Sequence, residues 1–153
     1  MSPRAAWRLE SIGFQHVYDY AAGKSDWGAS GLPLEGTLAT RAGDIARRDV
    51  PTCGLDELVA DVRKRIRAAG WHTCVVVNDE GVVFGQVGES ELAAHAGATV
   101  EEAMRPGPST VRPSASIATI RRRIEKHDLA TVIVTRSDGR LLGVVRREDL
   151  AAF

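Results

Sequence analysis

The sequence contains one motif written twice. Residues 42–95 align with residues 100–153 at a constant offset and without a gap, so that Gly85 lies opposite Gly143. Identical pairs concentrate at apolar and glycine positions, among them Thr52/Thr110, Arg63/Arg121, Ile66/Ile124, Thr73/Thr131, Val76/Val134, Gly81/Gly139, Val87/Val145 and Leu92/Leu150. A copy of about 50 residues is too small to bury its own apolar faces well. We therefore expect two similar units that pack on each other across a pseudo-twofold axis.

Each copy predicts an amphipathic helix. In the second copy, Ile117, Ile120 and Ile124 recur at spacings of three and four, and Ser114 or Ser116 is placed to begin the helix. The arginines between them, Arg121, Arg122 and Arg123, are expected to face solvent. The first copy has the corresponding apolar residues in register at Val59, Val62 and Ile66.

Each copy also predicts a β-hairpin. Apolar runs at 131–135 and 141–145 flank a turn that ends in Gly139, and runs at 74–77 and 82–87 repeat the pattern. A short strand should precede the helix, at 52–53 or 110–111, and a final helix should begin near Glu89 or Arg147. The fold class is therefore α/β (α+β), with two βαββα units whose strands are largely buried.

The pattern divides the chain into four parts. Residues 1–36 form an extension with a linker, 42–95 the first repeat, 96–108 an inter-repeat helix and linker, and 109–153 the second repeat. Thr99 and Glu102 predict a capping box for the inter-repeat helix, and the prolines and glycine of residues 106–108 end it.

Composition excludes several classes of protein. The chain has 153 residues, 20 Lys+Arg and 20 Asp+Glu, which is too short for a large multidomain enzyme and carries no net charge to attract nucleic acid or an acidic membrane. No apolar run approaches the ~18 residues that a bilayer crossing needs, and the N-terminus does not resemble a signal peptide. Cys53 and Cys74 are too few for a disulfide framework. We expect a cytoplasmic protein.

The repeat resembles a known regulatory module. With Thr110-Val111-Arg112-Pro113 ahead of its helix and a tail from Gly143 to Asp149, each unit is similar to a cystathionine-β-synthase (CBS) domain, in tandem over roughly residues 42–153. The resemblance implies a homodimeric module without catalytic activity or cofactor. It also implies an adenosyl ligand between the two repeats, such as AMP, ADP, ATP or S-adenosylmethionine, and an unidentified protein that the module regulates.

A ligand site is expected in the second repeat. Asp149 matches the family's ribose-binding position, since a carboxylate accepts hydrogen bonds from a cis-diol. Where the family has Ser or Thr, this chain has Arg146, which with Arg147 is suited to a phosphate. The apolar strands are expected to supply faces for the adenine. The full expected set is Thr110, Val111, Arg112, Val132, Ile133, Gly143, Val145, Arg146, Arg147 and Asp149.

A weaker site is expected in the first repeat, where Gly88 takes the hydroxyl position and Glu91 replaces Asp. Its residues are Thr52, Cys53, Val75, Gly85, Val87 and Glu91. The same residues also have an interpretation without a ligand. Asp149 is also suited to the first turn of a helix, where a carboxylate interacts favourably with the helix dipole, and the arginines are also suited to a solvent-exposed position. In that case the module is a ligand-free scaffold with degenerate sites.

The first 36 residues do not belong to the repeat. Ser2 and Pro3 predict the start of a helix that ends at Gly13, residues 17–20 predict a short strand, and residues 28–36 a linker. Five of the eight aromatic residues lie here, so the helix needs a surface to cover, either the repeat pair or a partner chain. The expected extension is helix, strand, helix.

This extension is similar to the C-terminal end of rhodanese-like sulfurtransferases, where a helix ending in Gly-Phe leads to Val-Tyr and then a Trp. In that family the persulfide-carrying Cys directly precedes the helix, whereas only Met1 and Ser2 do so here. The extension is therefore expected to be a structural remnant or docking arm, and residual sulfur transfer is the third hypothesis.

Overall fold

The computed structural model describes residues 2–30, 32, 40–95 and 97–153. Two helices form the extension, α1 (Ser2–Ser11) and α2 (Gly23–Ala29). The rest of the chain contains, in order, α3 (Ala42–Ile45), β1 (Thr52–Cys53), α4 (Val59–Ala68), β2 (Thr73–Val77), β3 (Val83–Gly88), α5 (Glu89–Ala94), α6 (Val100–Ala103), β4 (Arg105–Pro106), β5 (Thr110–Val111), α7 (Ile117–His127), β6 (Thr131–Thr135), β7 (Leu141–Arg146) and the 3-10 helix η1 (Glu148–Ala152).

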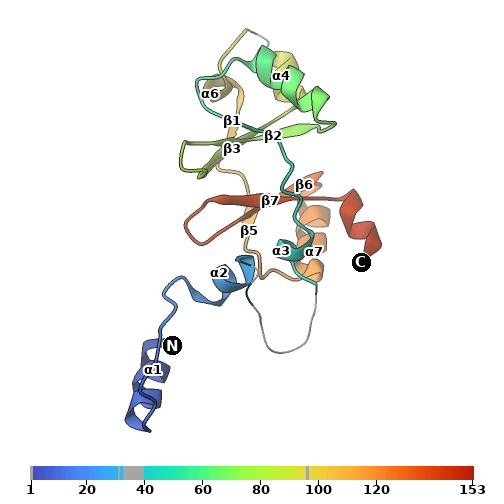
Figure 1. Cartoon of the computed structure of the whole chain (residues 1–153). Helices are drawn as coiled ribbons and strands as arrows, with labels where there is room; N and C mark the ends of the chain where they lie inside the picture. Colours follow the sequence, from blue (N-terminus) through green and yellow to red (C-terminus); the bar gives the residue numbers. More distant parts are fainter. Residues whose placement is uncertain (1, 31, 33–39, 96) are drawn as a thin grey trace.

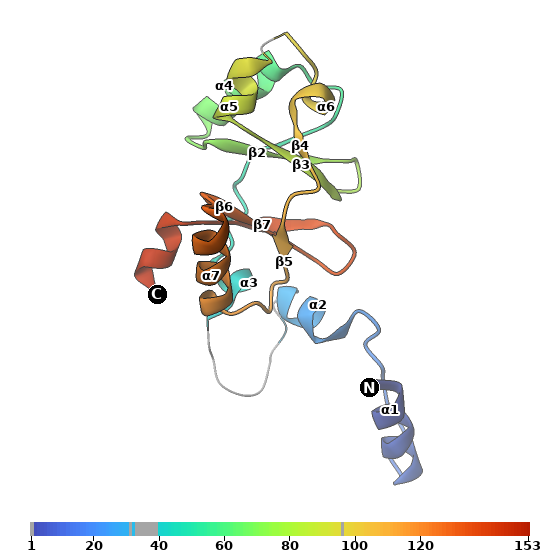
Figure 2. The ribbon, with the colours of Figure 1, turned by 180° about the vertical axis from the view of Figure 1, so that it is seen from behind.

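Two small sheets lie one above the other, with helices on their outer sides (Figures 1 and 2). The first has the order β1-β2-β3-β4 and carries α4, α5 and α6, and the second has the order β5-β6-β7 and carries α7 and α3. In each, the leading strand pairs in parallel with the next, and that strand pairs antiparallel with the third. The predicted α/β repeat pair is confirmed.

The helices form as their apolar spacing predicts. Ser116 caps α7, since its hydroxyl accepts a hydrogen bond from the Thr119 backbone N–H at 3.3 Å. The buried stripe of Ile120 and Ile124 then packs against β6 and β7. The capping box of α6 is also confirmed, because a Glu102 carboxylate oxygen accepts from both the backbone N–H and the hydroxyl of Thr99, at 3.0 and 3.2 Å.

The two repeats are joined at their hairpin turns. Val82 and Arg140 occupy equivalent positions and form an antiparallel bridge. The Val83 N–H donates to Gly139 O at 3.1 Å, and the Leu141 N–H donates to Gly81 O at 2.9 Å. Each hydrogen bond is the counterpart of the other, so the pseudo-twofold axis passes through this bridge.

The chain also crosses between the repeats just before each leading strand. Arg105–Pro106, expected to lie in a linker, forms β4 and pairs with β3 of the first repeat. At the equivalent place, Arg47 exchanges two backbone hydrogen bonds of 2.9 Å with Val144 in β7 of the second repeat. An exposed strand edge leaves N–H and C=O groups without partners, and these extended segments satisfy some of them.

The extension differs from its prediction. Residues 17–20 lie in no strand, since a strand forms only where another strand can pair with its N–H and C=O groups. The order is therefore helix and helix. Gly28 and Ala29, assigned above to a linker, belong to α2, and residues 31 and 33–36 of that linker lie outside the described residues. Within the described part of the chain, no helix is long and apolar enough to cross a membrane.

The two helices of the extension behave differently. Ala29 of α2 is buried in the core of the second repeat, while Tyr20 and Trp27 stack edge to face with ring centroids 5.3 Å apart. In contrast, α1 lies apart from both sheets (Figure 1), and Trp7 and Phe14 are 68% and 59% exposed. The apolar side of α1 therefore covers neither repeat.

Candidate functional site

A cluster of two arginines, a tryptophan and an aspartate lies where the two repeats meet. Trp71 stands just before β2 and is only 3% exposed. Arg146, the last residue of β7, places its guanidinium carbon 3.7 Å from the centroid of the Trp71 ring, and that of Arg47 lies 5.5 Å away. Such stacking on an indole face is a cation–π interaction. With Asp149, which follows β7, these residues are called the Arg–Trp cluster.

Asp149 is held at the edge of this cluster by the backbone. One of its carboxylate oxygens accepts a hydrogen bond from the Arg146 backbone N–H at 3.1 Å. The other lies 4.0 Å from a guanidinium nitrogen of Arg47, and the side chain remains 23% exposed. This second oxygen is therefore loosely held, beside two cations and within reach of solvent.

Two further carboxylates balance the arginines. Arg47 bonds Asp49 at 3.0 and 3.2 Å, and this hydrogen bond holds the pKa of Asp49 below its ordinary range. Arg146 donates to Glu148 at 2.8 Å and likewise lowers the pKa of Glu148. Asp49 and Glu148 are both exposed, so an anion that enters from solvent can replace them without leaving a buried charge unpaired.

In the first repeat, the carboxylate equivalent to that of Asp149 is fully paired with other groups of the chain. Glu91, the counterpart of Asp149, accepts from the Gly88 N–H at 2.9 Å and from Arg105 Nε at 2.6 Å, with Arg105 Nη2 in contact as well. Burial alone would raise the pKa of Glu91, but the bonds from Arg105 and Gly88 outweigh it and lower this pKa. Leu129 takes the place of Trp71, and Gly88 that of Arg146.

Glycines allow the chain to cross close to each site. A Cβ at Gly143 would lie 2.5 Å from the Arg47 carbonyl oxygen, and one at Gly85 would lie 2.9 Å from the Arg105 carbonyl oxygen. Both distances are too short for any side chain. These two glycines, predicted to belong to the ligand sites, act by letting the segments that carry Arg47 and Arg105 pair with β7 and β3.

A helix arginine holds the leading strand in each repeat. Arg65 donates to the Thr52 carbonyl at 2.6 Å, and Arg123 donates to the Thr110 carbonyl at 2.8 Å and to the Ser109 hydroxyl at 2.7 Å. Arg121 donates to the Leu150 carbonyl at 3.0 Å. Arg121 is exposed, as expected, whereas Arg123 is half-buried. Each of them also donates to a backbone oxygen of another element.

The residues expected to form one ligand site do not all lie together in the structure. Asp149 and Arg146 lie together, but Arg147 turns away to Asp128 at 2.6 Å and to the Leu129 carbonyl. Val111, Val132 and Val145 are buried in the core beneath α7, and Ile133 in the core between the sheets; in the first repeat, Cys53, Val75 and Val87 are buried in its core. Strand alternation directs these side chains into the two cores, and their contact with an adenine stays a prediction. Thr110 and Arg112 line a separate cavity.

Two residues of the cluster, Arg47 and Trp71, are missing from the expected site. Arg47 and Arg105 are one of the identical pairs of the repeat, although they stand outside its helices and hairpins. Trp71 is an aromatic residue where the second repeat has aliphatic Leu129. Both signals were present in the alignment, but the contact of Trp71 with Arg146 joins different repeats and has no counterpart within one copy.

The cysteines and histidines form no reactive centre in the part of the chain that the structure describes. Cys53 and Cys74 are free and buried, and the hydrogen bond with Cys53, together with burial, raises the pKa of Cys74. A thiol that stays protonated is a poor nucleophile. His72 bonds Glu89 at 3.0 Å, and no group of three metal-ligating side chains occurs among the described residues.

A profile of the CBS domain matches residues 42–97 and again residues 100–153. The chain belongs to the CBS-domain family. The resemblance stated from the sequence is thereby confirmed for the repeat pair, whereas the rhodanese-like extension stays a prediction.

The similar proteins and solved structures match about three quarters of this chain. The arabinose 5-phosphate isomerase KpsF of Escherichia coli is 29% identical over 120 residues, which is 73% of this chain and 36% of that protein. The chain thus spans about a third of this curated relative. Among solved structures, CBSX2 in complex with AMP has a TM-score of 0.70 at 20% identity, covering 74% of this chain and 95% of that one. The cytosolic domain of the Mg²⁺ channel MgtE in complex with ATP has a TM-score of 0.69 at 22% identity, covering 74% and 48%.

Proposed function

We propose that this CBS pair is a regulatory module that binds an adenosyl ligand, such as AMP, ADP, ATP or S-adenosylmethionine, at the Arg–Trp cluster. The observation that carries the proposal is the loosely held oxygen of Asp149 beside two guanidinium groups stacked on Trp71. Asp149 accepts hydrogen bonds from the ribose hydroxyls, and Arg47 and Arg146 bind the phosphates or the carboxylate. The similar solved structures of CBSX2 in complex with AMP and of the MgtE cytosolic domain in complex with ATP support this class of ligand.

Each chain binds one ligand, in the second repeat. In the first repeat, the Glu91 carboxylate already accepts a hydrogen bond from Arg105, and Gly88 provides no positive charge for a phosphate. The module works by binding and not by catalysis. It changes the state of a regulated protein, and it does so as a homodimer in the cytoplasm.

Isothermal titration of the full chain with AMP, ADP, ATP and S-adenosylmethionine tests the proposal. At a hundredfold excess over its Kd, a ligand adds about 2.7 kcal/mol to the free energy of unfolding, so thermal unfolding gives a second readout. We expect one site per chain. Asp149→Ala should weaken binding about tenfold or more, while Asp128→Asn, another carboxylate of the second repeat, should leave binding unchanged.

One observation favours a second function, that of a ligand-free scaffold. Every charge of the Arg–Trp cluster has an internal partner, since Asp49 and Glu148 neutralise the two arginines. If none of the four ligands binds, the module acts through its surfaces alone. Binding that survives Asp149→Ala would place the ligand elsewhere and contradict the proposed site.

A further inference from the structure

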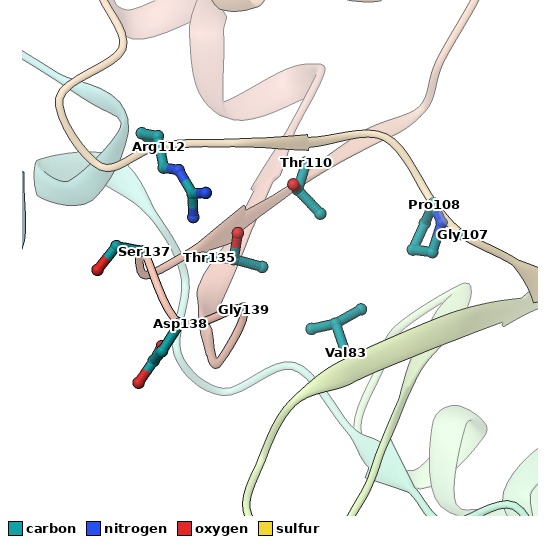
Figure 3. Close-up of a pocket in the computed structure, with 9 residues that line it drawn as sticks. All are labelled: Val83, Gly107, Pro108, Thr110, Arg112, Thr135, Ser137, Asp138 and Gly139. Atoms are coloured by element: carbon teal, nitrogen blue, oxygen red, sulfur yellow. The ribbon is translucent and has the colours of Figure 1, made fainter.

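A second cavity lies between the repeats and shares no lining residue with the Arg–Trp cluster. It has a volume of about 420 Å³ and lies between β5, the β6–β7 turn and the start of β3 (Figure 3). Its lining residues are Val83, Gly107, Pro108, Thr110, Arg112, Thr135, Ser137, Asp138 and Gly139. A water in the liquid takes about 30 Å³, so this cavity has room for a small organic molecule as well as for an inorganic ion.

Polar groups converge on this cavity from two strands. The guanidinium of Arg112 and the hydroxyls of Thr110 and Thr135 lie around the same space, with Val83 on its opposite side (Figure 3). Thr135 is only 2% exposed, and its hydroxyl faces this cavity together with those of its neighbours. A ligand in the cavity would therefore contact this hydroxyl.

The charge of the cavity favours an anion. Arg112 donates from one guanidinium nitrogen to the Arg136 carbonyl, so its other N–H groups remain available. The nearby carboxylate of Asp138 is already engaged, because it accepts from the Arg140 N–H at 3.1 Å and lies 3.7 Å from the Arg140 side chain. The free cationic face at this place therefore belongs to Arg112.

The first repeat shows that the fold itself does not require these residues. The leading threonine occurs in both copies, as Thr52 and Thr110, but Arg112, Thr135 and Ser137 correspond to Gly54, Val77 and Asp79. Those positions form the same strands and turn without a cation or a buried hydroxyl. The second repeat has thus acquired a guanidinium and two hydroxyls on one side of the pseudo-twofold axis.

We propose that this cavity binds a sugar phosphate. A guanidinium recognises a phosphate through two parallel hydrogen bonds, and threonine hydroxyls both donate to phosphate oxygens and accept from sugar hydroxyls. The lining offers only Val83 and Pro108 as apolar side chains, so it does not suit an aromatic base. The site is separate from the proposed nucleotide site, and the two can succeed or fail independently.

Titration calorimetry or ligand-observed NMR on the full chain tests this proposal. The probes are glucose 6-phosphate, ribose 5-phosphate, the corresponding free sugars and inorganic phosphate. We expect both sugar phosphates to bind more tightly than inorganic phosphate, and the free sugars to bind weakest. If no sugar phosphate binds at millimolar concentration, or if the free sugars bind as well, the proposal is wrong.

Variants that copy the first repeat locate the site. Arg112→Gln should weaken sugar phosphate binding about tenfold or more, and the nearly isosteric Thr135→Val about two- to tenfold. Because Arg112 also holds the Arg136 carbonyl, Thr135→Val is the decisive variant if Arg112→Gln proves unstable. Arg147→Gln, a matched arginine outside the cavity, should have no effect. Unchanged binding in Thr135→Val would overturn the proposal.

Asp149→Ala separates the two sites. It should weaken nucleotide binding about tenfold or more and leave sugar phosphate binding intact, while Thr135→Val should weaken sugar phosphate binding and leave nucleotide binding intact. If Thr135→Val weakens nucleotide binding as much as sugar phosphate binding, the cavity belongs to the nucleotide site, and the proposal of a separate sugar phosphate site is wrong.

Discussion

The two repeats have the same backbone and the same pair of charges at equivalent places, yet they hold this pair differently. In the first repeat, Arg105 makes close contacts with Glu91, whose side chain is 14% exposed. In the second, Arg47 stays 4.0 Å from Asp149 and bonds Asp49 instead. A single extra methylene in Glu91, with leucine in place of tryptophan, accompanies the change from an open pair to a closed one. A duplicated scaffold can therefore keep its fold while only one copy keeps a loosely held carboxylate.

The largest expected effect comes from Trp71. Trp71→Ala removes a nearly fully buried ring from the core of the first repeat and also the surface on which Arg47 and Arg146 stack, so it should cost about 3–5 kcal/mol. Urea denaturation measures this cost. The equivalent change Leu129→Ala affects a partly buried residue and should cost clearly less. Equal losses of stability in the two variants would show that Trp71 contributes no more to the fold than its counterpart Leu129.

A smaller effect is expected at the two crossing segments. Gly143→Ala forces a Cβ against the rigid Arg47 backbone, whereas in Gly85→Ala the nearest atom is the flexible end of the Met104 side chain, with the Arg105 carbonyl slightly farther away. Overpacking of this kind costs about 1–3 kcal/mol, and Gly143→Ala should lie at the upper end. Thermal unfolding compares the two variants. A greater loss in Gly85→Ala would contradict the assignment of the tighter crossing to the second repeat.

The smallest effect concerns acid stability. Because the pKa of Glu91 is held below its ordinary value of 4.5 in the folded chain, this residue stabilises the fold above that pH and loses the contribution as the pH falls through the folded pKa. Arg105 is largely exposed, so the contribution should not exceed about 1 kcal/mol. Stability measured between about pH 6 and 3 should fall less steeply in Glu91→Gln than in the unaltered chain.

Arg105→Gln provides the control for this pH profile, since it removes the partner and leaves the carboxylate in place. It should flatten the same part of the profile. If Glu91→Gln and the unaltered chain show parallel profiles, the closed pair of the first repeat contributes nothing to acid stability, and the difference between the repeats is one of geometry alone.

The sequence predicted the fold far better than the site. Spacing of apolar residues in two aligned copies was enough for the helices, the hairpins and the capping residues Ser116 and Thr99. It failed at residues 17–20, which were expected to form a strand but pair with none of the strands that the structure describes. Local patterns specify local structure, and a strand also needs a partner that the pattern does not reveal.

Of the four residues of the Arg–Trp cluster, the sequence predicted only Asp149 and Arg146. The other two come from a different repeat. Trp71 belongs to the first repeat and Arg146 to the second, and Arg47 reaches the cluster through the segment of the first repeat that precedes β1. Aligning the two copies reveals only the features that both contain. The contacts of the Arg–Trp cluster join residues of different copies, so the alignment does not reveal them. The valines of the strands, expected at a ligand, also fill the two cores.

The exchange of segments at β4 and at Arg47 bears on how such a chain arose. Each half completes its sheet with the stretch that leads into the other half, so a gene encoding one half would produce a polypeptide with an uncovered strand edge. Two such polypeptides, associating about a true dyad, would make the same pairings. Fusion of their genes would preserve these pairings and free each copy to diverge. Cutting the present chain between its halves should accordingly yield fragments that recombine when mixed.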